Sequence, residues 1–181
     1  MDVAARFLDV PEFRDRRWKH VQAVGGLAER LAPAFGQDGQ LLVASAWLHD
    51  IGYAPQLLRS GFHPLDGAWH LDERKAGERL AGLVANHSAA AFEADLRGLM
   101  SQMAPYPDEG TQVRDALWTC DMTTSPVGER VDLDGRLAEI TARYGAEHTL
   151  TRALRGAADE IRAAIERTRA RVAGHGILVD F

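Results

Sequence analysis

The sequence predicts an all-α, single-domain helical bundle, and three observations support this fold class. Apolar residues recur at spacings of three and four along most of the chain, which is the period of a helix. Strand signals are scarce, because β-branched residues are scattered and apolar and polar residues never alternate for long. No internal repeat and no linker rich in Ser, Gly or Pro divides the 181 residues, a length that suits one domain with a full core.

The first two helices are expected to form the centre of this bundle. The first covers about residues 14–35 and ends near Pro33 and Gly36; its apolar stripe consists of Val24, Leu27, Leu31 and Phe35. The second covers about residues 40–49 and is apolar on every side, which is typical of a buried central helix. Gly52 ends this apolar run, and a loop over residues 53–62 follows.

The remaining helices are predicted from periodicity and from their end signals, over residues 63–71, 75–87, 90–100, 111–122, 132–144 and 150–172. Pro64 occupies the favoured first position of the third helix, and two prolines make residues 104–110 a loop. Residues 175–181 are open to two interpretations, a strand or an ordered tail. We expect a core over residues 14–122, with the helices over 132–173 packed on it.

Composition restricts the classes of function. The formal charge of −5 argues against a nucleic acid polymer as partner. The first thirty residues lack the pattern of a signal peptide, and no apolar stretch is long enough to span a membrane. A single cysteine, Cys120, fits a reducing compartment, so we expect a cytoplasmic protein. Lys19 and Lys75 are the only two lysines, which limits any mechanism that needs one.

Histidines and aspartates supply the candidate site. His20 lies on the apolar stripe of the first helix, His49 and Asp50 end the buried helix, and His63 opens the next. His87 and Asp121 each follow apolar residues at spacings of three, four, seven or eight, and so share an inward face. Six residues of metal-ligand type are therefore predicted to point inward: His20, His49, Asp50, His63, His87 and Asp121.

Each of these residues alone has an ordinary explanation. A His-Asp pair is frequent by chance, a single inward histidine is more often a hydrogen-bonded core residue, and an inward aspartate usually caps a helix or joins an ion pair. Repeated over five helices, this explanation requires two buried carboxylates with large desolvation penalties. A divalent cation satisfies imidazoles and carboxylates together, so we predict a metal site between the helices.

The motifs around these residues resemble those of the HD domain superfamily of metal-dependent phosphohydrolases. The similar segments are RWKH at 17–20, LHDIG at 48–52, HPLDGA at 63–68, NHS at 86–88 and TCD at 119–121. The segment at 63–68 resembles the branch that adds ligands for a second metal. The resemblance covers roughly residues 14–121 and implies a helical bundle of the HD-domain type.

The resemblance also implies a ligand set and a reaction. His20, His49, Asp50 and Asp121 would hold a first divalent ion, and His63 and His87 a second, with Asp50 bridging. Fe or Mn is expected ahead of Mg, Zn or Ni. The implied substrate is a small phosphate ester or nucleotide; the nearest branches are a bacterial one with two irons that hydrolyses dinucleoside polyphosphates, and cyclic-dinucleotide phosphodiesterases.

One departure from that branch concerns the charge near the phosphate. Tyr53 stands where those relatives usually have a lysine, so phosphate charge would fall to Arg17, Arg59 or the metals. Arg17 either contacts phosphate or pairs with a carboxylate. Asp66 is either a proton acceptor or partner of a ligand imidazole, or an acid stabilised by the helix dipole. We take Asp50, Asp66 and Arg17 as the candidate catalytic residues.

Two other functions remain open from the sequence. The same ligand cage serves a di-iron oxygenase, although the missing lysine argues against it as well. A regulatory domain that binds metal or nucleotide with weak catalysis is the second alternative. The amphipathic helix over 150–172 fits either completion of the core or formation of a homodimer.

Overall fold

The computed structural model describes residues 1–179, and their regular structure is helical, as predicted. Within this range the only β pairing is an isolated antiparallel bridge between Thr124 and Arg130. None of the described helices combines the length and the apolar character needed to cross a lipid bilayer. The all-α, single-domain prediction is therefore confirmed for the described part of the chain.

Two short helices precede the first predicted one. α1 (Asp2–Leu8) and α2 (Pro11–Arg14) were not predicted, because seven and four residues contain too few turns to show a period. Ala4 and Leu8 are buried in a cluster with Trp18 and Trp47, so α1 covers one side of the central helices.

α3 (Arg17–Leu31), α4 (Gly39–Leu48) and α9 (Gln112–Met122) form the centre, and each packs against the other two. α3 is shorter than predicted, because the chain turns into the 3₁₀ segment η1 (Ala32–Asp38) where Pro33 and Gly36 lie. Leu27, Leu42 and Leu117 are buried together in this core. The helix that was predicted to be central and apolar on every side is therefore α4.

α5 (His63–Glu73) and α6 (Glu78–Ala85) pack as a pair beside α4, after the 3₁₀ turns η2 (Ile51–Tyr53) and η3 (Pro55–Leu57). α6 begins later than predicted because Lys75 and Gly77 have φ of 55° and 107°, outside the right-handed helical region. The 3₁₀ turn η4 (His87–Ala89) leads into α7 (Ala90–Leu96), and α8 (Met100–Met103) follows. The single helix predicted over 90–100 is interrupted at Gly98, where φ is 69°.

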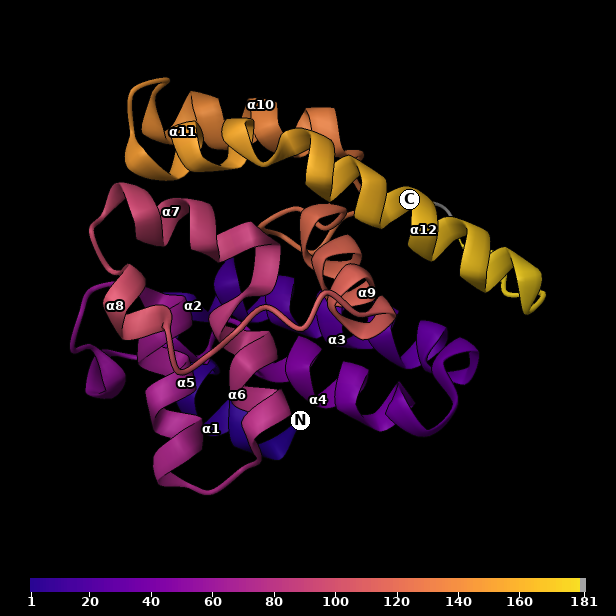
Figure 1. The fold of residues 1–181 in the computed structure, drawn as a ribbon, viewed down its shortest axis with the longest axis horizontal. Helices are drawn as coiled ribbons and strands as arrows, with labels where there is room; N and C mark the ends of the chain where they lie inside the picture. Colours follow the sequence, from indigo (N-terminus) through magenta and orange to yellow (C-terminus); the bar gives the residue numbers. More distant parts are fainter. Residues whose placement is uncertain (180–181) are drawn as a thin grey trace.

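The C-terminal part forms a second layer, seen in orange and yellow in Figure 1. α10 (Leu133–Tyr144) and α11 (Thr149–Gly156) form a hairpin, and α11 packs on α7. α12 (Ala158–Gly174) packs along α9. The helix predicted over 150–172 is two helices that meet at Ala157. Residues 175–179 contain no strand, and the rest of the predicted tail lies outside the described residues.

Candidate metal centre

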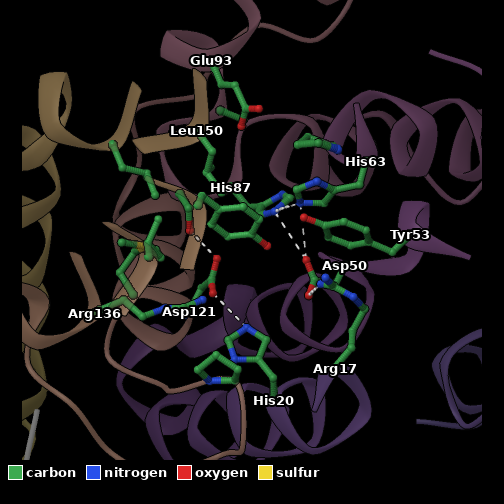
Figure 2. A pocket seen from close by; sticks show the side chains of 18 of the residues that line it. Arg17, His20, Asp50, Tyr53, His63, His87, Glu93, Asp121, Arg136 and Leu150 are labelled. Atoms are coloured by element: carbon green, nitrogen blue, oxygen red, sulfur yellow. Dashed lines mark hydrogen bonds and ion pairs between the residues drawn. The ribbon is translucent and has the colours of Figure 1, made fainter. Parts of the chain in front are cut away.

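The structure brings the six predicted ligand residues together beside one cavity, which all of them line except the fully buried His49. His20 comes from α3, His63 from the start of α5, His87 from η4 and Asp121 from the end of α9, while His49 and Asp50 directly follow α4. Figure 2 shows imidazoles and carboxylates from these separate elements pointing into one space. Among the six residues only the His63 side chain is appreciably accessible, at 15 %.

Asp50 belongs to two groups of ligand atoms. One group consists of His20, His49 and Asp50, the other of Asp50, His63 and His87, and within each group the ligand atoms lie within 4.8 Å of one another. Asp50 Oδ1 is 3.6 Å from His49 Nε2 and 3.4 Å from His63 Nε2. Asp121 Oδ1 adjoins the first group, 3.0 Å from His20 Nε2. A carboxylate placed in this way can serve two ions.

Main-chain carbonyls determine which nitrogen of three imidazoles faces the cavity. The Nδ1 atoms contact carbonyl oxygens at 3.1 Å (His20 to Ser125), 2.7 Å (His49 to Ala46) and 2.6 Å (His87 to Val84). Because a carbonyl oxygen only accepts, Nδ1 of each ring is the protonated donor and Nε2 carries the lone pair. All three lone pairs are therefore on the ligand side, the arrangement that orients metal-binding histidines in proteins.

The surroundings of these Nε2 atoms differ: His87 Nε2 lies 3.0 Å from His63 Nε2, whereas His49 Nε2 meets acceptors alone. His49 Nε2 is buried and has no hydrogen-bond partner, and its neighbours are carboxylate oxygens of Asp50 and Asp121 at 3.6 and 3.9 Å. His20 Nε2 faces a carboxylate oxygen of Asp121. A buried acceptor without a donor is unfavourable, and a cation between such atoms removes the conflict. Neutral imidazoles together with carboxylates suit Zn, Fe and Mn.

The electrostatic environment favours the protonation states that metal binding requires. Burial opposes ionisation of Asp50, but Arg17 and the surrounding imidazoles outweigh it and hold its pKa below the usual value. The pKa of Asp121 is also lowered, because its contacts with His20 and the neighbouring imidazoles outweigh burial. Burial and the neighbouring imidazoles lower the pKa of His63 and of His87. Ionised carboxylates and neutral imidazoles need not lose protons at neutral pH to bind an ion.

The lowered histidine pKa values predict a pH dependence of stability in the metal-free protein. An unfolded histidine has a pKa of about 6.5, so below this pH the unfolded state binds protons that buried His63 and His87 resist. The free energy of unfolding should therefore fall between about pH 7 and 5, by up to about 1.4 kcal/mol per pH unit for each histidine.

Urea unfolding at pH 7, 6 and 5, with a chelator present, measures this dependence. The double substitution His63→Gln and His87→Gln should flatten the profile. The same double substitution would leave the profile unchanged if other groups caused the pH dependence.

Arg17 and Tyr53 form a stack beside Asp50. Arg17 Nη1 is 2.5 Å from Asp50 Oδ2, so the pairing with a carboxylate that the sequence left open is present. The guanidinium carbon lies 3.2 Å from the centre of the Tyr53 ring, which stacks on His63 at 3.9 Å. Tyr53 has no positive charge of its own, but its ring holds the Arg17 guanidinium beside Asp50. Arg59 is exposed, paired with Glu73, and does not line the cavity.

Asp66 is not brought to this cluster. It is buried, and its Oδ1 accepts hydrogen bonds from the Ser60 amide at 2.8 Å and the Ser60 hydroxyl at 2.7 Å. These bonds fix the turn before α5, which begins at His63. A role as proton acceptor stays a prediction for Asp66, and its contacts support a structural one.

Ser88 ends the family-like NHS segment but was not predicted as a site residue, and it contacts the cluster directly. Its hydroxyl donates to Asp121 Oδ2. Ser88 and Ala89 have φ of 49° and 58°, a left-handed conformation that costs about 1–3 kcal/mol for residues other than Gly. Gly or Asn would have signalled such a turn, but neither stands here, so only the tertiary structure shows it.

The cavity above the cluster has a volume of about 390 Å³ and extends to the C-terminal layer. Figure 2 shows Arg136 and Leu150 on its far side from Tyr53 and Arg17. Seven of its lining residues come from α10 and α11: Arg136, Ile140, Arg143, Tyr144, Leu150, Ala153 and Leu154. Sequence reasoning missed these residues because they follow the last recognisable motif.

Comparison with known proteins gives one match. A family model described as "HD domain" matches residues 17–116, which is more than half of the chain. Five of the six clustered ligand residues lie inside this range, and Asp121 and the helices α10–α12 lie beyond it. No curated protein and no solved structure matches the chain.

Proposed function

The chain belongs to the HD domain family, and on that premise we propose that it is a metal-dependent phosphohydrolase acting on a small phosphate ester, with nucleotides as the first class to test. The observation that carries this proposal is the buried cluster of imidazoles and carboxylates, in which His49 Nε2 is an acceptor without a donor. Three imidazole lone pairs and two ionised carboxylates face one another, and His49 Nε2 has no partner. A divalent cation explains this arrangement better than a structural polar network does.

We assign the ligands to two ions. His20, His49, Asp50 and Asp121 would hold the first, and His63 and His87 the second, with Asp50 shared. The presence of Asp50 in both groups of ligand atoms supports this assignment. When bound, the ions supply positive charge to the phosphoryl group and lower the pKa of a water molecule. The protein's own contribution is to fix the ligands and to enclose the ester in the cavity.

Arg17 is proposed to stabilise the phosphoryl group in place of the lysine found at position 53 in the similar branch. Its guanidinium lines the cavity and is held over Tyr53 beside the shared ligand Asp50. Burial opposes the charge of Arg17, but Asp50 outweighs it and raises the Arg17 pKa, so the cation is permanent. A fixed cation at this position would counter the negative charge that develops during hydrolysis.

Replacement of Arg17 by Gln should lower kcat by about 10²-fold, because a preorganised charge is lost. The metal content at saturating metal should stay at the wild-type level. Steady-state kinetics and elemental analysis measure the two quantities. Arg59→Gln is the matched control, since Arg59 is exposed and paired with Glu73. Wild-type kcat in the Arg17 variant would refute this role.

The proposed function is tested by elemental analysis of the purified protein, followed by a phosphoester and nucleotide panel with Mn²⁺ or Fe²⁺ under anaerobic conditions. We expect bound metal and release of phosphate that requires the metal but not oxygen. Turnover only with oxygen would indicate an oxygenase. Metal binding with no turnover on any ester would favour a regulatory domain, and no metal after reconstitution would refute the proposal.

A further inference from the structure

Helix α10 presents one face to the cavity. Arg136, Ile140, Arg143 and Tyr144 all line it, and their spacings of four, seven and eight place them on one side of the helix. This helix lies beyond residues 17–116, the part that matches the family model. The α10 face therefore lies outside the part of the chain that the family match covers.

Three arginines on this side of the cavity share one carboxylate. Arg136 Nη1 donates to Glu139 Oε2 at 2.7 Å, Arg143 Nη2 donates to Oε1, and Arg16 Nη2 lies 3.6 Å from Oε1. All three arginines line the cavity, whereas Glu139 does not. One carboxylate cannot neutralise three guanidiniums, so positive charge remains on the cavity side.

The donors of this cluster also exceed its acceptors. The Arg136 side chain is only 12 % exposed, and its Nε is buried without a hydrogen-bond partner. Besides the metal-ligand candidates Asp50 and Asp121, two acidic residues line the cavity; Glu93 is paired with Arg97, and Glu12 is exposed. A guanidinium that lines a cavity and keeps an unsatisfied N–H favours a ligand that brings an oxyanion.

Tyr144 connects this face to the metal end of the cavity. It lines the same cavity as Arg17 and Tyr53, the residues beside Asp50. The arginine cluster and the metal centre are thus two parts of one cavity. A molecule in that space can contact both.

We propose that Arg136 and Arg143 bind a second anionic group of the substrate, so that the chain selects phosphate esters that carry another phosphate or a carboxylate. The inference rests on the proposed function, which supplies the first anionic group at the metal centre. Guanidinium groups bind either oxyanion through paired N–H donors. When no such ligand is bound, the Glu139 carboxylate accepts the hydrogen bonds of Arg136 and Arg143.

The test is calorimetric titration of the full-length, Mn²⁺-loaded protein with three non-hydrolysable probes. Methylphosphonate carries one anionic group, whereas propane-1,3-diphosphonate and 3-phosphonopropionate carry two. Both two-anion probes should bind about tenfold more tightly than methylphosphonate, and the comparison between them shows whether phosphonate or carboxylate is preferred.

Two variants test the residues. Arg143→Gln should remove most of the tenfold advantage and leave methylphosphonate affinity unchanged. Glu139→Gln should increase the affinity for the two-anion probes several-fold, because it removes the internal competitor, and structural damage would not produce a gain. Arg162→Gln is the control, since Arg162 pairs with Asp134 of α10 and does not line the cavity.

The outcomes separate this inference from the proposed function. Methylphosphonate binding without an advantage for the two-anion probes would overturn the inference and leave the phosphate site intact. Equal weakening of all three probes by Arg143→Gln would also overturn it. If no phosphonate binds the metal-loaded protein, the proposed function itself fails, and the inference fails with it.

Discussion

Asp50→Asn should abolish metal binding at both positions and lower kcat/KM by about 10³-fold or more. Asp50 Oδ1 lies 3.6, 3.4 and 3.9 Å from Nε2 of His49, His63 and His87, so one carboxylate serves both ligand groups. Asparagine keeps the shape but removes the charge. Loss of a residue that only orients a ligand costs about 10–100-fold, and loss of a shared ligand should exceed that.

Elemental analysis and phosphate release measure the two effects in the same preparation. Asp38→Asn is the matched control, because Asp38 belongs to an exposed ion pair with Arg79 and should leave both quantities unchanged. Wild-type metal content in the Asp50 variant would show that the protein binds its ions without Asp50. Circular dichroism and urea unfolding distinguish loss of metal from loss of the fold.

Helical periodicity explains why most of the site was predictable from the sequence. His20 and Asp121 share the faces of Leu27 and Leu117, so burial of those leucines turned both ligands inward. The all-α class followed from the same period.

Contacts between distant segments were not predictable in this way. The choice of Asp50 as partner of Arg17 depends on how α3 lies against the turn after α4, 33 residues away in the sequence. The cluster around Glu139 likewise needs α10 to lie over the cavity, and no motif beyond Asp121 indicates that placement. The left-handed turn at Ser88 has no signal in its residue type.

Gly52→Ala should destabilise the fold by at least about 3 kcal/mol, the upper range for overpacking in a core. A Cβ at this position would lie 2.0 Å from the carbonyl oxygen of His63 and 2.6 Å from the amide nitrogen of Gly67. Both are backbone atoms of α5, so no side chain can rotate away. The helix itself would have to move, and His63 would move with it away from Asp50.

Gly26→Ala provides the contrast, because Gly26 lies inside α3 and an added Cβ would meet no atom within 4 Å beyond the neighbouring residues and backbone of its own helix. That change should raise the free energy of unfolding by about 0.5–1 kcal/mol, since alanine favours the helix. Urea unfolding of both variants separates steric contact from the mere loss of a glycine. Any Gly52→Ala protein that still folds should bind less metal, because α5 carries His63. Equal stability and full metal content in that variant would show that Gly52 does not set the distance between α5 and the metal centre.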